Sequence, residues 1–163
     1  MFKFFKKNKS KNNDFVSIAN PMKGKILNIE DVPDPVFAQK MVGDGFAVDP
    51  IDGEIHAPVS GEIVLQPDGL HALSIRTDKG LEVMVHFGMD TVELNGEGFS
   101  TDVNIGDKVE KGDVILNIDI DLVKKRVSSM ISPVIITNPD MCEISEINFD
   151  AKQDEAVIKA YIK

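Results

Sequence analysis

Short apolar runs, each bounded by a turn-forming residue, recur along almost the whole chain and constrain its fold more than any other feature. The runs are FVSIA, GKILNI, GFAV, GEIVL, HALSI, LEVMVHF, DVILNI, VIIT, ISEINF and AVIKAYI, and Gly, Pro, Asp or Asn bounds each of them. Such runs are typical of strands, and their close spacing is typical of a two-sheet sandwich or barrel. We therefore expect an all-β fold, an antiparallel β-sandwich of the barrel-sandwich kind.

One segment, DIDLVKKRVSSMI, has a helical pattern instead. Its apolar residues recur at helical spacing, at Leu122, Val123, Val127 and Met130. Either Asp119 or Asp121 offers a side-chain cap for the start of a helix. The sequence therefore predicts one or two short helices, with this one lying over an end of the sheets.

Two stretches of the chain resemble each other. NPMKGKIL (20–27) and APVSGEIV (57–64) share a proline, a glycine three residues later, and an apolar pair after one intervening residue. A duplicated strand unit with internal pseudo-symmetry accounts for the match. Pro-x-x-Gly is also a common entry to a strand, so both interpretations stay open.

Size and charge narrow the class of protein. The 163 residues suit one domain, and the single cysteine, Cys142, cannot form an internal disulfide, which favours a reducing cytoplasm. No run approaches the length of about 18 apolar residues that a membrane span requires. The net charge of −9 argues against a nucleic-acid partner, which needs a basic face, and favours a partner with a basic docking surface.

The first residues differ from the rest in charge. MFKFFKKNKSK holds five lysines and no acid, which leaves 13 basic residues against 27 acids, a net charge of −14, for residues 12–163. We expect residues 1–14 to be a flexible leader, and 15–163 to be the folded domain. Phe2, Phe4 and Phe5 are too few for a signal peptide but suit an anchor on the anionic inner face of a membrane. A merely solvated leader is the alternative.

The sequence contains few candidate catalytic or ligand-binding residues. It has no GxxxxGK[ST] loop, no GxGxxG before a helix and no G-x-S-x-G elbow, so nucleotide-dependent and serine-hydrolase chemistry have no support. Three histidines remain: His56, His71 and His86. His56 precedes Ala57-Pro58 at the entry to a strand, and we interpret it as structural.

His86 lies at the end of a predicted strand. Strand alternation puts Leu81, Val83, Val85 and Phe87 in the core, and Met84 with His86 on the outer face. An apolar Met84 on that face suggests an apolar surface patch around the ring. A lone histidine in such a place is also common as a surface or capping residue, so position alone does not decide its role.

A second histidine, His71, is expected to lie near His86. A short loop around Lys79 and Gly80 joins the two strands, and in a hairpin centred there residue 86 lies opposite residue 73, give or take one or two. The pairing brings His71 close to His86. Two neighbouring imidazoles can share one reactant, one attacking it while the other donates a hydrogen bond.

At this point the residues resemble a known family. GLEVMVHFGMDTVELNGEGF is similar to the signature of the glucose-type enzyme IIA of the bacterial phosphoenolpyruvate-dependent sugar phosphotransferase system. The blocks EDVPDPVFAQKMVGDGFAV, APVSGEIV, LHALSI, GDKVEKGDVIL and SPVIITN also resemble family blocks, in the family's order. The resemblance covers nearly the whole chain.

The resemblance implies a phosphocarrier. The histidine matching His86 accepts a phosphoryl group from the carrier HPr and passes it to the IIB domain of a sugar permease. The histidine matching His71 supports the transfer by a hydrogen bond and is not itself phosphorylated. Neither a cofactor nor a metal is implied.

The resemblance also implies a docking surface, an apolar patch ringed by acids. Its matching apolar positions are Val36, Phe37, Met41, Val42, Met84 and Val92. Asp34 and Asp90 are offered to arginines of a partner, and Gly88 leaves clearance beside the ring. Apart from the resemblance, Phe37 and Met41 also suit a core-facing turn. The sequence departs from the family at Gly69, where many relatives have a threonine whose hydroxyl orients the supporting histidine, and at Pro67, which replaces an aromatic residue.

Parts of the sequence also resemble two other classes of protein. A biotinyl or lipoyl carrier is suggested by GDKVEKGDVIL and NPMKGKIL, but the Met-Lys-Met and Asp-Lys-Ala tripeptides of such carriers do not occur. A zinc peptidase on a related sandwich is suggested by His86 and Asp90, which form H-x-x-x-D. Such a site needs a third protein ligand, and the expected H-x-H is missing.

Overall fold

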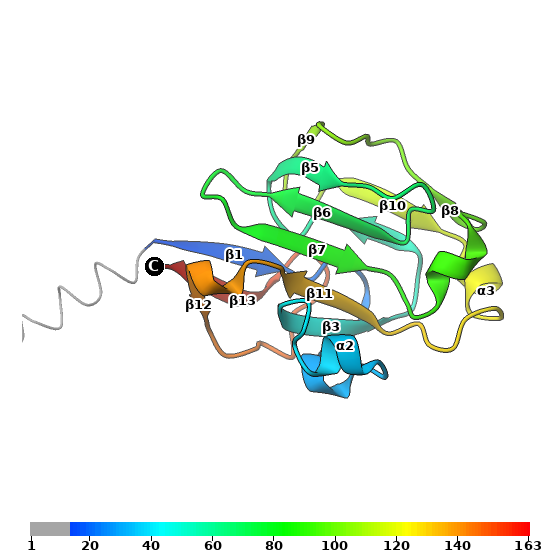
Figure 1. Cartoon of the computed structure of the whole chain (residues 1–163), viewed down its shortest axis with the longest axis horizontal. Helices are drawn as coiled ribbons and strands as arrows, with labels where there is room; N and C mark the ends of the chain where they lie inside the picture. Colours follow the sequence, from blue (N-terminus) through cyan, green and yellow to red (C-terminus); the bar gives the residue numbers. More distant parts are fainter. Residues whose placement is uncertain (1–13) are drawn as a thin grey trace, which may run out of the picture.

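The structure, a computed structural model, describes residues 14–163, and these form a sandwich of antiparallel sheets (Figure 1). The largest sheet has seven strands in the order β2-β3-β11-β7-β6-β5-β9. Its strands are β2 (Gly24–Asn28), β3 (Asp44–Pro50), β5 (Gly61–Leu65), β6 (Ala72–Arg76), β7 (Glu82–His86), β9 (Lys108–Val109) and β11 (Ser132–Ile136). The all-β antiparallel class expected from the sequence is confirmed.

Two three-stranded sheets complete the sandwich. One has the order β1-β13-β12, with β1 (Phe15–Ala19), β12 (Cys142–Ile144) and β13 (Ala156–Ile162). The other has the order β4-β10-β8, with β4 (Glu54–His56), β8 (Phe99–Ser100) and β10 (Val114–Ile118). In Figure 1, β10 of this sheet lies behind β6.

The main core fills the space between the large sheet and the two small ones. The inward residues of β6 and β7, among them Leu73 and Val83, meet Ile115 of β10 and Ile158 of β13 in one buried cluster. All four side chains are at most 2% exposed, so they leave water almost completely on folding. The alternation read from the sequence is confirmed, since Leu81, Val83, Val85 and Phe87 all belong to this core.

The two similar sequence stretches occupy matching places in the large sheet. Strands β2, β3 and β11 lie on one side of the central pairing of β11 with β7, and β7, β6 and β5 lie on the other, where β9 adds a further strand beside β5. Each repeated glycine begins a strand and abuts its partner's backbone. A Cβ atom at Gly24 would lie 2.1 Å from the carbonyl oxygen of Asp49, and one at Gly61 would lie 2.1 Å from that of Arg76. The repeated glycine therefore allows close strand entry in both halves.

The described helices are short. They are η1 (Ile29–Asp31), α2 (Pro35–Ala38), η2 (Thr91–Leu94), α3 (Ile120–Val123) and η3 (Pro139–Met141). Asp119 caps α3 by accepting a hydrogen bond from the amide of Leu122 at 3.2 Å. Of the two predicted caps, Asp119 and Asp121, it is therefore Asp119 that begins the helix. The helix predicted over 119–131 is wrong beyond Val123, because residues 128–132 instead bond to the loop that follows β7.

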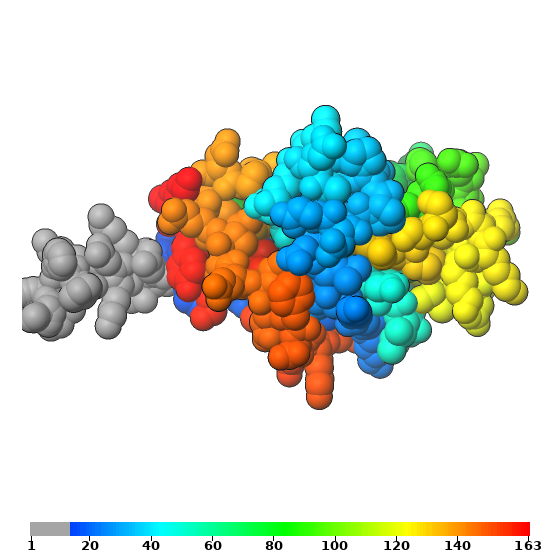
Figure 2. Space-filling model, turned by 90° about the horizontal axis from the view of Figure 1, so that it is seen from below, coloured from blue at the N-terminus to red at the C-terminus, as the bar shows by residue number. Residues whose placement is uncertain are grey.

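A second apolar cluster lies on the outer face of the large sheet. The excursion 29–43, which contains η1 and α2, folds over this face and forms a prominent mass in Figure 2. It buries a set of apolar side chains that belong to both layers: Ile29, Val32, Phe37, Ala47, Ala72, Met84, Met89 and Ile135. The excursion is therefore the element that covers the apolar residue predicted beside His86.

Some strand predictions differ from the structure. ISEINF, predicted as a strand, has only its first residue in one, because β12 ends at Ile144. The short strands β4, β8 and β9 were not among the predicted runs. No helix among the described residues is long and apolar enough to cross a membrane. The leader predictions, including Phe2, Phe4 and Phe5, fall on residues 1–13, outside the described residues.

Candidate functional site

Two histidine rings meet at one end of the β6–β7 hairpin. Ala72 lies opposite His86, one residue from the predicted partner, and His71 immediately precedes Ala72. The carbonyl of His71 also accepts a hydrogen bond from the amide of Phe87 at 2.8 Å, which extends the ladder past the strand ends. The ring centroids of His71 and His86 lie 5.5 Å apart, edge to face. The predicted proximity of the two rings is confirmed.

One nitrogen of His86 is fixed by the backbone. Its Nδ1 lies 3.0 Å from the carbonyl oxygen of Gly88. A carbonyl can only accept, so Nδ1 carries the proton and the lone pair of the neutral ring is on Nε2. The ring of Phe37 packs against the same imidazole with the centroids 5.0 Å apart. The packing and the hydrogen bond together hold the ring in one orientation.

The surroundings keep His86 neutral at physiological pH. Burial, which penalises the charged imidazolium, and the neighbouring His71 lower the pKa of His86 to about 4. The Gly88 carbonyl and the charge of Asp34 act in the opposite direction but are outweighed. A neutral imidazole with a free Nε2 is a nucleophile, so the ring is ready to attack an electrophile at pH 7.

His71 lacks a fixed partner on one nitrogen. Its Nδ1 is buried and has no hydrogen-bond partner among residues 14–163. A Cβ at Gly69 would lie 3.6 Å from this nitrogen, so the absence of a side chain at Gly69 leaves the gap beside it. The missing hydroxyl at Gly69 thus coincides with a ring nitrogen of His71 that has no partner. Burial also lowers the pKa of His71, which favours its neutral form.

The loop after His86 is bonded to residues 128–132. The hydroxyl of Ser132 accepts from the amide of Gly88 at 3.0 Å, and the carbonyl of Ser129 accepts from the amide of Met89 at 2.9 Å. The hydroxyl of Thr91 donates to the carbonyl of Phe87 at 2.7 Å. Sequence reasoning missed Ser129 because it assigned residues 119–131 to a helix. It gave no role to Ser132, which comes just before the predicted strand VIIT, and no local pattern marks either serine.

The role predicted for Gly88 needs correction. Gly88 is buried and has φ +65, a left-handed conformation that favours glycine. A Cβ there would lie 3.0 Å from Cγ2 of Thr91 and 3.2 Å from the carbonyl oxygen of Ser129. The glycine is thus required by the backbone and by internal packing, and it does not simply clear space for docking.

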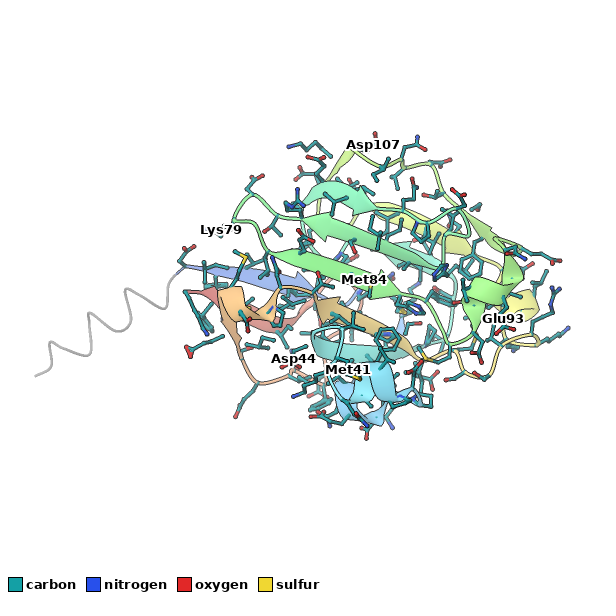
Figure 3. All side chains as sticks on the ribbon, viewed as in Figure 1. Met41, Asp44, Lys79, Met84, Glu93 and Asp107 are labelled. Carbon is teal, nitrogen blue, oxygen red and sulfur yellow. The ribbon has the colours of Figure 1, made fainter. Side chains whose placement is uncertain are left out.

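The predicted apolar patch divides into exposed and buried members. Val36, Met41 and Val92 are 41%, 70% and 57% exposed, and Val42 is partly buried. Met84 and Phe37, at 8% and 7% exposed, belong to the second apolar cluster and support the patch from beneath. The predicted exposure of Met84 is wrong, because the excursion 29–43 covers it. Phe37 is itself part of this excursion and faces inward, in agreement with the alternative of a core-facing turn. Figure 3 labels Met84 on β7 and Met41 on this excursion.

Two carboxylates accompany the patch. Asp34 caps α2 by accepting a hydrogen bond from the amide of Val36 at 2.9 Å, and its charge acts on the ring of His86. Asp90 has a left-handed backbone, with φ 63, and its carboxylate accepts a hydrogen bond from the hydroxyl of Ser128. A carboxylate has about four acceptor positions, so both retain capacity for cationic donors.

His56 lies in the β4-β10-β8 sheet and is bonded on both sides. Its Nδ1 is 2.8 Å from Oδ1 of Asp154 and its Nε2 is 2.8 Å from Oε1 of Glu54. Burial alone would lower the pKa of His56, but the two carboxylates outweigh it and raise the pKa. This arrangement joins β4 to the turn at Asp154, in agreement with a structural role.

A metal centre finds no support in the part of the chain that the structure describes. No group of three or more His, Cys, Asp or Glu side chains there is placed to hold a metal ion. Asp90, the second residue of the H-x-x-x-D pattern, is engaged with Ser128.

Comparisons with known proteins agree on one family. Residues 16–142 match the family described as phosphoenolpyruvate-dependent sugar phosphotransferase system, EIIA 1. A PTS system glucose-specific EIIA component of Halalkalibacterium halodurans is 49% identical over 126 residues, 77% of this chain and 73% of the relative. One of Staphylococcus aureus is 42% identical over 161 residues, 99% of this chain and 94% of the relative.

A solved structure resembles the whole fold. The glucose permease IIA from Mycoplasma capricolum superposes with a TM-score of 0.87 at 35% sequence identity. The match covers 98% of this chain and 99% of that one.

Proposed function

This chain belongs to the EIIA 1 family of the phosphoenolpyruvate-dependent sugar phosphotransferase system, and we propose that it is a phosphocarrier whose phosphoryl acceptor is Nε2 of His86. In this proposal His86 receives the phosphoryl group from phospho-HPr and then transfers it to the IIB domain of a sugar permease. Glucose is the proposed sugar, since the relatives from Halalkalibacterium halodurans and Staphylococcus aureus are glucose-specific components.

The single observation that carries the proposal is the state of the His86 ring. Its Nδ1 is hydrogen-bonded to Gly88, its pKa is lowered to about 4, and its Nε2 keeps a lone pair. A phosphoryl acceptor needs this combination, because a protonated Nε2 cannot attack phosphorus.

The transfer can be written with its charges balanced. Nε2 of neutral His86 attacks phosphorus, and the bond between phosphorus and the donor atom of HPr breaks as the Nε2–P bond forms. The ring retains the Nδ1 proton and becomes a cationic phosphoimidazolium, whose N–H donates to the Gly88 carbonyl. This protonated ring is a good leaving group, so the same hydrogen bond assists the second transfer, in which IIB attacks phosphorus and neutral imidazole departs.

We assign a supporting role to His71. Its Nδ1 is buried beside Gly69, so Nε2 is the nitrogen left to meet a ligand. With its proton on Nε2, neutral His71 donates a hydrogen bond to a phosphoryl oxygen and stabilises charge in the transition state.

Docking uses the exposed part of the patch. Val36, Met41 and Val92 offer apolar contact area, and Asp34 and Asp90 offer carboxylates to arginines of HPr or IIB. The overall charge of −9 supports steering toward a basic partner face. A cytoplasmic location suits both partners, and the lysine- and phenylalanine-rich leader is proposed to touch the anionic inner face of the membrane.

A reconstituted phosphoryl relay tests the proposal. With phosphoenolpyruvate, the first enzyme of the relay and HPr, we expect one acid-labile phosphoryl group per chain and none on His86→Ala. His71→Gln is expected to accept the group but to pass little of it to a glucose-type IIB domain. Label on His86→Ala would refute the acceptor, and normal transfer to IIB by His71→Gln would refute the role of His71.

A further inference from the structure

The carbonyl that orients His86 belongs to a residue with unusual backbone freedom. Gly88 has φ +65 and no side chain, so the two peptide groups on either side of it can rotate more easily than those of other residues. Its carbonyl oxygen must nevertheless stay 3.0 Å from Nδ1 of His86 to fix the ring. Something outside the loop must therefore hold this backbone.

Residues 129–132 hold both peptide groups. The peptide before Gly88 donates its N–H to the hydroxyl of Ser132 at 3.0 Å. The peptide after it, which carries the critical carbonyl, donates the N–H of Met89 to the carbonyl of Ser129 at 2.9 Å. Of these two anchors, only the Ser132 hydroxyl is a side chain, so it alone can be removed by substitution.

The Ser132 hydroxyl is itself fixed. Ser132 is fully buried, and its hydroxyl donates its proton to the carbonyl of Met130 at 2.9 Å. Since the proton is used there, the oxygen presents a lone pair to the amide of Gly88. Nδ1 of His86 is thus linked to Ser132 and Met130 by hydrogen bonds on both sides of Gly88, joined through the Cα of that residue.

We propose that Ser132 is a positioning residue for phosphoryl transfer, which keeps the Gly88 carbonyl aimed at His86 and thereby keeps the lone pair of the ring on Nε2. The inference rests on the proposed phosphocarrier function. Ser132 touches neither the imidazole nor the phosphoryl group and acts only through the backbone of Gly88.

Removal of the hydroxyl has a defined local effect. Ser132→Ala leaves the backbone of β11 paired to Val48 of β3 but leaves the amide of Gly88 without its partner. A buried amide without a partner is unfavourable, so the loop shifts toward conformations in which the Gly88 carbonyl leaves Nδ1. The ring then samples both neutral tautomers, and a fraction of the protein carries its proton on Nε2.

The test compares Ser132 variants with a matched control. The control is Ser145, which follows β12. Its hydroxyl also accepts a hydrogen bond from a backbone amide, that of Lys159 at 2.8 Å, and donates one to a carbonyl, that of Glu146 at 3.0 Å. Ser132→Ala, Ser132→Cys, Ser132→Thr and Ser145→Ala are each measured in two ways. The first is the ¹⁵N chemical shift of both His86 ring nitrogens in the unphosphorylated protein, and the second is the rate of phosphoryl acceptance from phospho-HPr.

The expected results separate positioning from general stability. Ser132→Ala should move both ring shifts toward a tautomer mixture and slow acceptance about tenfold, roughly the effect of one buried hydrogen bond. Ser132→Cys, whose larger sulfur is a weaker acceptor, should give an intermediate shift. Ser132→Thr keeps the hydroxyl but adds a methyl group at a buried position, and its ring shifts should stay close to those of the wild type. Ser145→Ala should leave the ring shifts unchanged.

Two results would overturn the proposal. One is a Ser132→Ala protein with wild-type ring shifts, and the other is an equal loss of rate in Ser132→Ala and Ser145→Ala. Because the ring shifts need no phosphoryl donor, they decide the role of Ser132 even if wild-type protein accepts no phosphoryl group, which would instead refute the proposed function.

Discussion

The reactivity of His86 depends on the groups that surround its two nitrogens. Phe37 and the buried strand end remove water from the ring, while Gly88 occupies Nδ1. These contacts act together, since burial makes the neutral ring the stable form and the hydrogen bond decides which nitrogen keeps the lone pair.

A pH titration of the His86 ring checks this balance. The pKa of His86 is lowered from 6.5 to about 4 by burial and by His71, so we expect an NMR titration midpoint near 4. The folded state favours the neutral ring. Its contribution to stability is therefore present above pH 6.5 and is lost as the pH falls from 6.5 toward 4. Wild-type protein should lose stability relative to His86→Gln over that range. A midpoint near 6.5 would contradict the account.

The orphaned Nδ1 of His71 offers a second prediction. A Cβ at Gly69 would lie 3.6 Å or more from every neighbour, so a small side chain fits there. Gly69→Ser should place a hydroxyl where it donates to Nδ1 of His71, and this bond should stabilise the fold by about 1 kcal/mol.

Gly69→Ala is the control for this change. It reduces the freedom of the unfolded chain to a similar extent but adds no hydrogen bond. The free energy of unfolding, measured by urea denaturation, should be higher for Gly69→Ser than for Gly69→Ala. Equal values would mean that the hydroxyl does not reach the ring.

Among the elements, the excursion 29–43 has the largest influence on the site. It covers the outer face of the large sheet, places Phe37 against His86 and carries the exposed Val36 and Met41. The excursion 29–43 thus excludes water from the ring of His86 and also provides exposed apolar side chains on the neighbouring surface.

Substitution of Phe37 tests this double role. Phe37→Ala should lower the free energy of unfolding by about 3 kcal/mol, because it removes a buried aromatic side chain. It should also raise the pKa of His86 toward 6.5, since water then reaches the ring. Chemical denaturation and NMR titration measure the two effects.

Met41→Ala provides the contrast within the same element. Met41 is 70% exposed, so its removal should change the free energy of unfolding by at most about 0.5 kcal/mol and leave the pKa of His86 unchanged. Equal losses in the two variants would show that Phe37 does not pack as described.

The sequence predicted the elements whose patterns are local. Alternation located the core residues of β7, and the hairpin register was correct to one residue, because both depend on neighbours along the strands. The cover that residues 29–43 form over the large sheet was not predicted, and residues 128–131 were wrongly assigned to a helix. Strand alternation alone places Met84 on the surface, because the segment that covers it is distant in the sequence. The contact of Ser132 with Gly88 likewise depends on the pairing of β11 with β7, which no local pattern indicates.

For the whole molecule, the sheet arrangement explains why the site is rigid yet reachable. His86 ends β7, which lies between β6 and β11 in the seven-stranded sheet. The backbone of His86 pairs with Ala72 of β6, and the preceding residue, Val85, pairs with both β6 and β11. The strand ends at His86, and the loop that follows leads to η2, which carries the exposed Val92. A carrier that serves two partners in turn needs such a fixed acceptor at an accessible edge.

The measurement that tests the central claim most directly is NMR of the protein phosphorylated through HPr. The account predicts that the ¹⁵N resonance of His86 Nε2 shifts and couples to phosphorus, while Nδ1 keeps its proton and its hydrogen bond to Gly88. Phosphorus bound to Nδ1 of His86, or to any other residue, would contradict it.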